Sequence, residues 1–385
     1  MPHIEAMGLQ ESAFGTADHD LHRIRRAALN PFFSKNTVRK LEPLIQERVT
    51  KILSRCNDFK DLDRPLILSD MFSAFSNDVV TEYCFGFHYH RLEKQDFDAV
   101  VKQTIHAQAS MNHLNRHLPI IFQSIMLLPS WVLRMAIPSM ALVENFGSDC
   151  AKAINAIKAS SSSEVSKASH ATIFTELLEG DLPANEKSVP RLIQEAHIVT
   201  AAGTETTAWC LSVIIFHLLD KPYLLQKLRR ELEEAIPDIS VEAPWLTLEK
   251  LPYLSACIQE GLRLSYGTPT SMDTHSVHHN ESIYPSSYEF KPERWLDNPR
   301  LDKYLVSFTK GTRQCAGINL AYAEIYIALA NIMRRYGGPG SPGPDGNFEL
   351  YETDEGDVKM VADYFIPFVK ADTKGVRVLV KKSVV

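Results

Sequence analysis

One cysteine, Cys315, lies in a short segment whose residue types could hold a flat, metal-containing group. The residues after it are typical of a helix, and the free N–H groups and dipole at a helix N-terminus favour an anion, so the sequence predicts a stabilised thiolate. Gly311 and Gly317 permit tight turns and close approach, and Arg313 adds a fixed positive charge. A lone thiolate makes no zinc site, but it does make an axial ligand for haem iron. The alternative is a cysteine that only fills apolar space.

A second group of candidate residues interrupts a long apolar run at 193–219. The run is apolar nearly all round, which predicts a helix at the centre of a domain. Gly203, close to Thr206, is expected to weaken this helix and allow a bulge beside a ligand. The hydroxyl of Thr206, backed by the carboxylate of Glu205, could pass protons into a pocket that excludes water. The alternative is a threonine bonded back to its own helix.

Two pairs of charged or basic residues also have helical spacing. Glu260 and Arg263 are three residues apart, so a helix places them on one face, where they can pair. His22 and Arg26 are four apart in a basic stretch near the start. Such a stretch can also be a solvated helix face or a contact for an acidic partner.

The elements expected to position these residues are mostly helices. Apolar residues recur at three- and four-residue spacing in 222–236, 250–264 and 318–334, which indicates amphipathic helices. Strand patterns are sparse and late: valines alternate in 376–380, and we expect 364–369 to be the partner of that strand. The sequence therefore predicts a mainly α fold.

Composition excludes several classes of protein. The 385 residues carry 41 basic and 47 acidic side chains, a net charge of −6, which argues against nucleic acid as a partner. The 6 cysteines form no CxxC pair, which favours a reducing compartment. Prolines and an arginine interrupt the apolar stretch 118–143, so we expect no membrane helix there. We expect 160–169 and 337–346 to be exposed loops within one domain spanning 1–385.

The cysteine segment resembles the signature of the cytochrome P450 family, F-x-x-G-x-R-x-C-x-G. Every fixed position of that signature is met, at Phe308, Gly311, Arg313, Cys315 and Gly317. The resemblance implies a haem b cofactor whose iron is ligated by Cys315. It also implies that Phe308 packs beside the sulfur and that Arg313 pairs with a haem propionate.

Three further motifs resemble the family in the same order along the chain. Residues 202–207 match A/G-G-x-D/E-T-T/S, which implies that Ala202 and Gly203 border the haem and that Glu205 and Thr206 are catalytic. The third motif contains Glu260, Arg263 and Arg294, and the fourth contains His22 and Arg26.

The E-x-x-R pair, Glu260 and Arg263, is followed by a P-E-R-W segment containing Arg294. The resemblance implies that these three residues form a buried network that fixes the cysteine loop. The family's W-x-x-x-R becomes His22-x-x-x-Arg26, which implies that His22 and Arg26 contact the propionates, because buried carboxylates need paired cations.

The resemblance implies a mainly α haem domain with small β sheets and monooxygenase activity. Such a protein inserts one oxygen atom from O2 into a small apolar substrate, and residues 277–295 resemble fungal members that act on terpenoids or other specialised metabolites. No nucleotide-binding motif such as GxGxxG is present, so electrons are expected from NADPH through a separate reductase.

The sequence also departs from the family pattern. Full-length eukaryotic members carry a membrane anchor and first strands before the His22 helix, and a further segment after the position of Tyr266, so we expect an incomplete fold. An anchored relative is expected at the endoplasmic reticulum membrane, whereas this chain is expected to be soluble or peripheral. The alternatives are a non-catalytic remnant, or a haem-thiolate isomerase or dehydratase that uses no reductase.

Overall fold

The computed structural model describes most of the chain. The described residues are 9–62, 64–118, 120, 124, 127–129, 132–133, 135, 140–159, 172–266, 273–364 and 366–383. The serine-rich stretch expected at 160–169, and the residues that directly follow Tyr266, lie outside this part of the chain.

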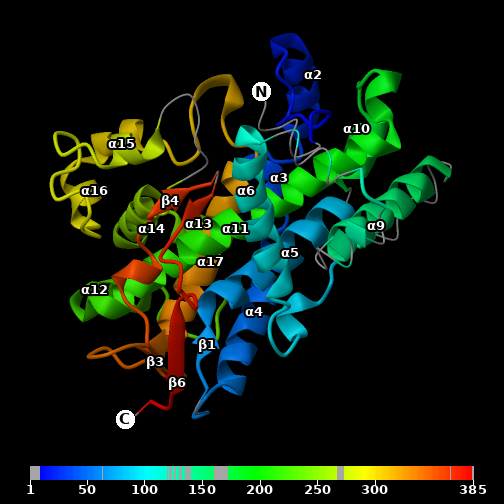
Figure 1. Cartoon of the computed structure of the whole chain (residues 1–385). Helices are drawn as coiled ribbons and strands as arrows, with labels where there is room; N and C mark the ends of the chain where they lie inside the picture. The colour runs from blue at the N-terminus through cyan, green and yellow to red at the C-terminus, as the bar shows by residue number, and fades with distance from the viewer. Residues whose placement is uncertain are drawn as a thin grey trace.

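Helices gather around one long central helix, α11 (Val189–Asp220), as the sequence predicts (Figure 1). Helices α5, α14 and α17 pack directly against it. The described helices other than α11 are α2 (His19–Leu29), α3 (Lys35–Arg39), α4 (Glu42–Asp58), α5 (Leu68–Phe85), α6 (Val100–His117), α9 (Met140–Ala159), α10 (Ile173–Glu179), α12 (Pro222–Ala235), α13 (Trp245–Leu248), α14 (Pro252–Leu264), α15 (Thr274–His278), α16 (Glu293–Asp297) and α17 (Ile318–Arg335). Short 3-10 turns are η1 (Arg91–Glu93), η2 (Ala184–Lys187), η3 (Pro299–Tyr304), η4 (Gly311–Arg313) and η5 (Glu355–Asp357).

The local sequence explains where these helices begin and which faces they bury. Proline occupies the first turn of α11, α12 and α14, where its missing N–H breaks no helical hydrogen bond. From Thr207 to Leu219 every side chain of α11 is buried except the half-buried Trp209. Neighbours therefore surround this helix on all sides, which is why its sequence lacks a polar face.

The bulge expected at Gly203 is absent, because α11 is helical without interruption from Val189 to Asp220. Gly203 instead allows the neighbouring helix to approach closely. A Cβ atom added there would lie 3.0 Å from Cγ2 of Val80 on α5. The glycine serves helix packing, and the expectation of a local break was wrong.

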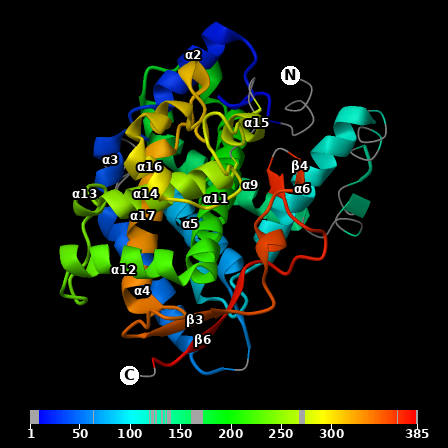
Figure 2. The ribbon, with the colours of Figure 1, turned by 90° about the vertical axis from the view of Figure 1, so that its left-hand side faces the viewer.

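A four-stranded sheet lies at the end of the molecule opposite α2 (Figures 1 and 2). Its order is β1-β6-β3-β2, with strands β1 (Leu66–Ile67), β2 (Tyr336–Gly337), β3 (Gly346–Leu350) and β6 (Arg377–Lys381). Strand β6 runs antiparallel to both neighbours, and Phe348 pairs with Val380 in register. Both of these side chains are fully buried, so this face of the sheet closes the helical core.

Two expectations about this end of the chain were wrong. The segment 364–369 does not pair with β6, because β1 and β3 occupy both of its edges; instead β5 (Pro367–Phe368) pairs with β4 (Ala362–Asp363). The expectation of an exposed loop at 337–346 was wrong for its two ends, which belong to β2 and β3, and for Ser341 and Gly343, which are buried. A Cβ on Gly337 would lie 2.0 Å from the carbonyl oxygen of Ser341, so glycine permits this tight, buried fold-back.

Within the described part of the chain, α11 is the helix long and apolar enough to cross a membrane by composition. However, 56% of its most apolar window is buried inside the protein. Such burial is typical of a core helix.

Candidate active site

Cys315 lies between the 3-10 turn η4 and the start of α17. Its backbone N–H donates to the carbonyl oxygen of Phe308 over 3.0 Å, which closes the loop between them. Its side chain is exposed, whereas the other five cysteines are all buried. The loop therefore presents one accessible thiol beside a helix N-terminus.

The electrostatic surroundings of this thiol differ from the expectation. Although solvent reaches Cys315, the surrounding protein is dense enough that desolvation raises the pKa of the thiol above its usual value. The backbone N–H of Gly317 and the guanidinium of Arg26 lower that pKa, but they do not outweigh desolvation. The helix start and Arg26 therefore act in the predicted direction, but burial, which the sequence could not show, has the larger effect. A bound metal cation deprotonates a coordinating thiol directly.

Three basic side chains gather near Cys315. His22 and Arg26 come from α2, and Arg313 comes from η4, where its Nη2 donates to the carbonyl oxygen of Thr16 over 2.7 Å. Burial, and then the charges of Arg313 and Arg26, lower the pKa of His22. Burial also lowers the pKa of Arg26, while Cys315 acts to raise it. These mutual effects indicate that the four groups lie near one another.

The two arginines of this group lack a direct ion pair among the described residues, although the charge of Glu195 acts on Arg26. Within the described residues, neither Arg26 nor Arg313 forms a salt bridge with a carboxylate. The region therefore suits a ligand that brings its own negative charges, as the two propionates of haem do.

The small residues around the thiol leave room for a flat group. A Cβ added at Gly311 or Gly317 would meet no atom within 4 Å, so open space lies beside both glycines. On α11, Ala202 and Thr206 lie one turn apart and are exposed, although most of this central helix is buried. An accessible thiol, unpaired cations and open space fit the chemistry of a thiolate-ligated haem.

The structure separates the side chains of Glu205 and Thr206. Oγ1 of Thr206 donates to the carbonyl oxygen of Ala202 over 2.8 Å, which is the back-bonded arrangement weighed above as the alternative. Oε1 of Glu205 instead lies 2.7 Å from Nε2 of His106 on α6. Its second oxygen, Oε2, is buried and has no hydrogen-bond partner among the described residues.

Sequence reasoning missed His106. It lies 99 residues before Glu205 in the chain, and no motif connects the two. Only the packing of α6 on α11 brings them together.

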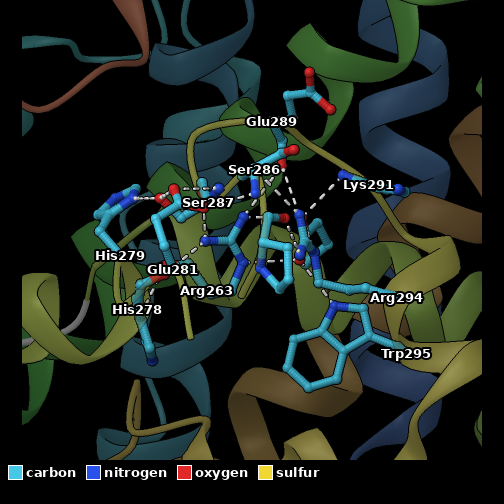
Figure 3. Close-up of polar contacts among 12 residues, drawn as sticks. Arg263, His278, His279, Glu281, Ser286, Ser287, Glu289, Lys291, Arg294 and Trp295 are labelled. Atoms are coloured by element: carbon cyan, nitrogen blue, oxygen red, sulfur yellow. Dashed lines mark hydrogen bonds and ion pairs between the residues drawn. The ribbon is translucent and has the colours of Figure 1, made fainter. Parts of the chain in front are cut away.

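The structure brings Glu260, Arg263 and Arg294 together in one buried network (Figure 3). Both oxygens of Glu260, which is fully buried, accept from Arg263 at 2.9 Å. Nε of Arg294 donates to Oε1 of Glu260 over 3.0 Å, and the backbone N–H of Lys291 donates to it over 2.9 Å. The indole N–H of Trp295 donates to Oε2 over 2.9 Å, a contact that sequence reasoning did not anticipate. Five donors thus satisfy one buried carboxylate.

Comparisons with known proteins agree with this architecture. A sequence model of the cytochrome P450 family matches residues 2–274 and 265–337. The chain is 39% identical to the cytochrome P450 monooxygenase tpcC of Cochliobolus heterostrophus, over 97% of the chain and 78% of the relative. It is 34% identical to the cytochrome P450 monooxygenase TRI4 of Fusarium sporotrichioides, over 96% of the chain and 74% of the relative. It is also 34% identical to the tryptophan 6-hydroxylase fscE of Fusarium equiseti, over 98% of the chain and 77% of the relative.

The chain belongs to the cytochrome P450 family. It is a haem-binding monooxygenase of the kind found in fungal secondary metabolism, with the mainly α fold of that family.

The comparisons also reveal an internal difference from the relatives. The alignment with tpcC extends over 407 positions, more than the 385 residues of this chain, so tpcC has residues inside the aligned span that are missing here. The two matches to the family meet and overlap at 265–274. This is the position, after Tyr266, at which the sequence predicts a missing segment.

Proposed function

We propose that Cys315 ligates the iron of haem b and that the protein inserts one oxygen atom from O2 into a small apolar substrate. We propose a fungal specialised metabolite such as a terpenoid as substrate, with electrons supplied by NADPH through a separate reductase. The observation that carries this proposal is the exposed cysteine at the start of α17, set beside two arginines that form no salt bridge among the described residues. When bound through a thiolate, haem supplies the activation of dioxygen.

The residues around the thiol have distinct roles in this proposal. Arg26 and Arg313 hold the two propionates by charge, because neither forms a salt bridge with a carboxylate among the described residues, and the neutral imidazole of His22 donates a hydrogen bond to them. Gly311 and Gly317 leave space for the macrocycle, since no atom lies within 4 Å of a Cβ at either position.

The remaining contacts come from the loop and from α11. Phe308 anchors the loop: its carbonyl oxygen accepts from Cys315, and its ring centroid lies 5.2 Å from that of Tyr322 on α17. Ala202, which is exposed and has a small side chain, would let α11 approach the macrocycle, whereas Gly203 faces Val80 on α5.

Thr206 and Glu205 handle protons in this proposal. The Oγ1 atom of Thr206 is exposed, and beyond the proton it donates to Ala202 it has lone pairs that can accept from a water or a bound ligand. Oε2 of Glu205 has no partner among the described residues, so it can hold a proton, while Oε1 contacts the partly exposed His106. Protons reach a site enclosed by α11 through side chains of this kind.

A non-catalytic haem-binding role is the second candidate function. The observation that favours it is that tpcC has residues inside the aligned span that this chain lacks. A pocket that lacks one wall admits water, which competes with productive chemistry.

Oxygen incorporation distinguishes these functions. The haem-loaded chain, a fungal reductase and NADPH are incubated under isotopically labelled O2 with a panel of apolar terpenoids, and the products are analysed by mass spectrometry. The proposal expects one labelled oxygen atom per product molecule and a requirement for NADPH. Haem binding without any product supports the non-catalytic role, and unlabelled product without NADPH supports an isomerase or dehydratase.

A further inference from the structure

His278, at the end of α15, joins two segments that are distant in sequence. The residue is fully buried. Its Nδ1 lies 2.8 Å from the carbonyl oxygen of Arg263 on α14, and its Nε2 lies 3.1 Å from the backbone nitrogen of Val306. One imidazole therefore spans from the buried charge network to the segment that leads into the cysteine loop.

The partners of this ring fix where its proton lies. The backbone N–H of Val306 can only donate, so Nε2 must accept, and Nδ1 must carry the proton that it donates to Arg263. Burial, followed by the charge of Arg263, lowers the pKa of His278 to about 3. The ring is therefore neutral near pH 7 and is held in one tautomer.

The acceptors come from the end of α14. The last carbonyl groups of a helix have no partner within the helix, so they are available to bind other segments. The carbonyl oxygen of Arg263 accepts from His278, and that of Leu262 accepts from the hydroxyl of Ser307 over 2.7 Å. Val306 and Ser307 are consecutive, so the end of α14 holds this segment at two adjacent positions.

The held segment leads directly to the thiol. Phe308, the next residue after Ser307, accepts the backbone hydrogen bond of Cys315 over 3.0 Å. The position of Cys315 thus depends on the placement of residues 306–308, which the end of α14 determines in part through His278.

The side chain of Arg263 also binds the backbone of His278. Nη1 of Arg263 donates to the carbonyl oxygen of His278 over 2.9 Å and to that of Ser287 over 2.6 Å. In Figure 3, Arg263 lies between the histidines on one side and Arg294 with Trp295 on the other. Each residue of the pair therefore uses its side chain to bind the backbone of the other, which fixes His278 firmly.

We propose that His278 is a positioning residue that couples the Glu260 network to the cysteine loop and so maintains thiolate ligation by Cys315. This inference rests on the proposed function, because its readout is the coordination of haem iron by Cys315. The ring supplies one donor to the end of α14 and one acceptor for the N–H of Val306, and the acceptor is the contact that holds the segment before the cysteine loop.

Three substitutions at one site separate these two hydrogen bonds. His278→Leu removes both. His278→Asn keeps a donor near the Nδ1 position but leaves the buried N–H of Val306 unpaired, which costs the desolvation of that group. His278→Gln places its amide oxygen near the Nε2 position and keeps the acceptor for Val306. The matched control is His217→Leu on α11, since His217 is also a buried histidine with a pKa lowered to about 3.

The experiment measures the thiolate-ligated fraction of the reduced, carbon monoxide-bound holoprotein by absorption, together with the melting temperature. We expect His278→Leu and His278→Asn to lose most of the thiolate band at temperatures where the protein stays folded, whereas His278→Gln and His217→Leu retain more than half of it. Equal retention in His278→Leu and His217→Leu overturns the inference. If His278→Leu does not fold, the comparison of His278→Asn with His278→Gln tests the inference. Equal thiolate-ligated fractions in these two variants, or a larger fraction in His278→Asn, overturn the inference.

The parent protein separates this inference from the function on which it rests. A parent without a thiolate band overturns the proposed function and this inference with it. A parent with the band, whose His278 variants all keep it, overturns this inference alone.

Discussion

At the scale of single residues, opposing electrostatic effects meet at Cys315. Desolvation raises the pKa of the thiol, while Arg26 and the N–H of Gly317 lower it. The sequence indicated the helix N-terminus but could not show how densely the protein surrounds the sulfur. Arg26 acts on the thiol from α2, which is distant in sequence and which the fold brings to the cysteine loop.

Replacing Arg26 tests this balance. In the haem-free chain, Arg26→Leu removes a nearby positive charge that lowers the pKa of Cys315, so this pKa is expected to rise further. The measurement is the pH dependence of Cys315 alkylation, followed by mass spectrometry of its peptide. Arg23→Leu is the control, because Arg23 is on the same helix but 73% exposed. Equal midpoints for the two variants would show that Arg26 does not act on the thiol.

Thr206 is expected to affect coupling rather than haem binding. In the chain with the missing segment restored, Thr206→Ala should keep the haem spectrum but divert electrons from product to peroxide, because an exposed hydroxyl on α11 is lost. We expect a several-fold fall in product per NADPH consumed. Thr206→Ser, which keeps the hydroxyl, should restore the parent ratio. If Thr206→Ala couples as well as Thr206→Ser, the hydroxyl only bonds to its own helix.

Motifs predicted the candidate site residues well, but they did not predict the residues that bind to them. The cysteine segment identified Cys315, Arg313 and the two glycines because their order along the chain is itself the signal. His106 and His278 carry no such signal, since each acts through a contact with a distant segment.

At the scale of elements, the Glu260 network connects α14 to the P-E-R-W segment and is expected to dominate local stability. Glu260→Ala leaves the buried guanidinium groups of Arg263 and Arg294 without their carboxylate, which costs roughly 3–5 kcal/mol of unfolding free energy. Urea unfolding, monitored by circular dichroism, measures this loss.

Lys152→Ala provides the control for this measurement. Lys152 forms a 3.0 Å ion pair with Asp149, but its side chain is 75% exposed, so its loss should cost less than about 1 kcal/mol. Similar losses in the two variants would contradict the account of Glu260 as the centre of a buried network.

Periodicity predicted the helices well but could not predict strand pairing. The ranges 222–236, 250–264 and 318–334 each coincide with a helix, because a repeating apolar stripe is a local signal. The partners of β6 come from residues 66–67 and 346–350, so its pairing depends on tertiary contacts. The fold-back at 337–346 was missed for the same reason: a run of Gly and Pro indicates a turn, but not its burial.

At the scale of the whole molecule, buried histidines make stability sensitive to acid. Burial lowers the pKa of both His217 and His278 from 6.5 to about 3. Between these pH values the unfolded chain binds protons that the folded chain does not, so stability falls as pH is lowered through this window. From pH 7 to pH 5, each histidine should cost roughly 2 kcal/mol of unfolding free energy.

The contribution of one histidine can be isolated by difference. Urea unfolding of the parent and of His217→Leu at pH 7 and pH 5 gives the acid-induced loss for each protein. The variant should lose roughly 2 kcal/mol less than the parent over this interval, because other titrating groups affect both proteins alike. Equal losses would mean that His217 is protonated in the folded protein.

The sequence predicted the overall architecture from one long apolar helix and a set of amphipathic helices. It also predicted a missing segment after Tyr266, and the two family matches overlap at that position. It could not predict the closing of the core by the sheet near the C-terminus, because strands as short as β1 and β2 leave almost no pattern. Their positions follow from the packing of β6 against the completed helical core.

The central claim is that Cys315 ligates haem iron, and the reduced, carbon monoxide-bound absorption spectrum tests it most directly. The haem-loaded parent should show the red-shifted Soret band of thiolate ligation. Cys315→Ala should lose that band, whereas Cys210→Ala, which removes a buried cysteine of α11, should keep it. A parent without the band, or a band that survives in Cys315→Ala, would contradict the account.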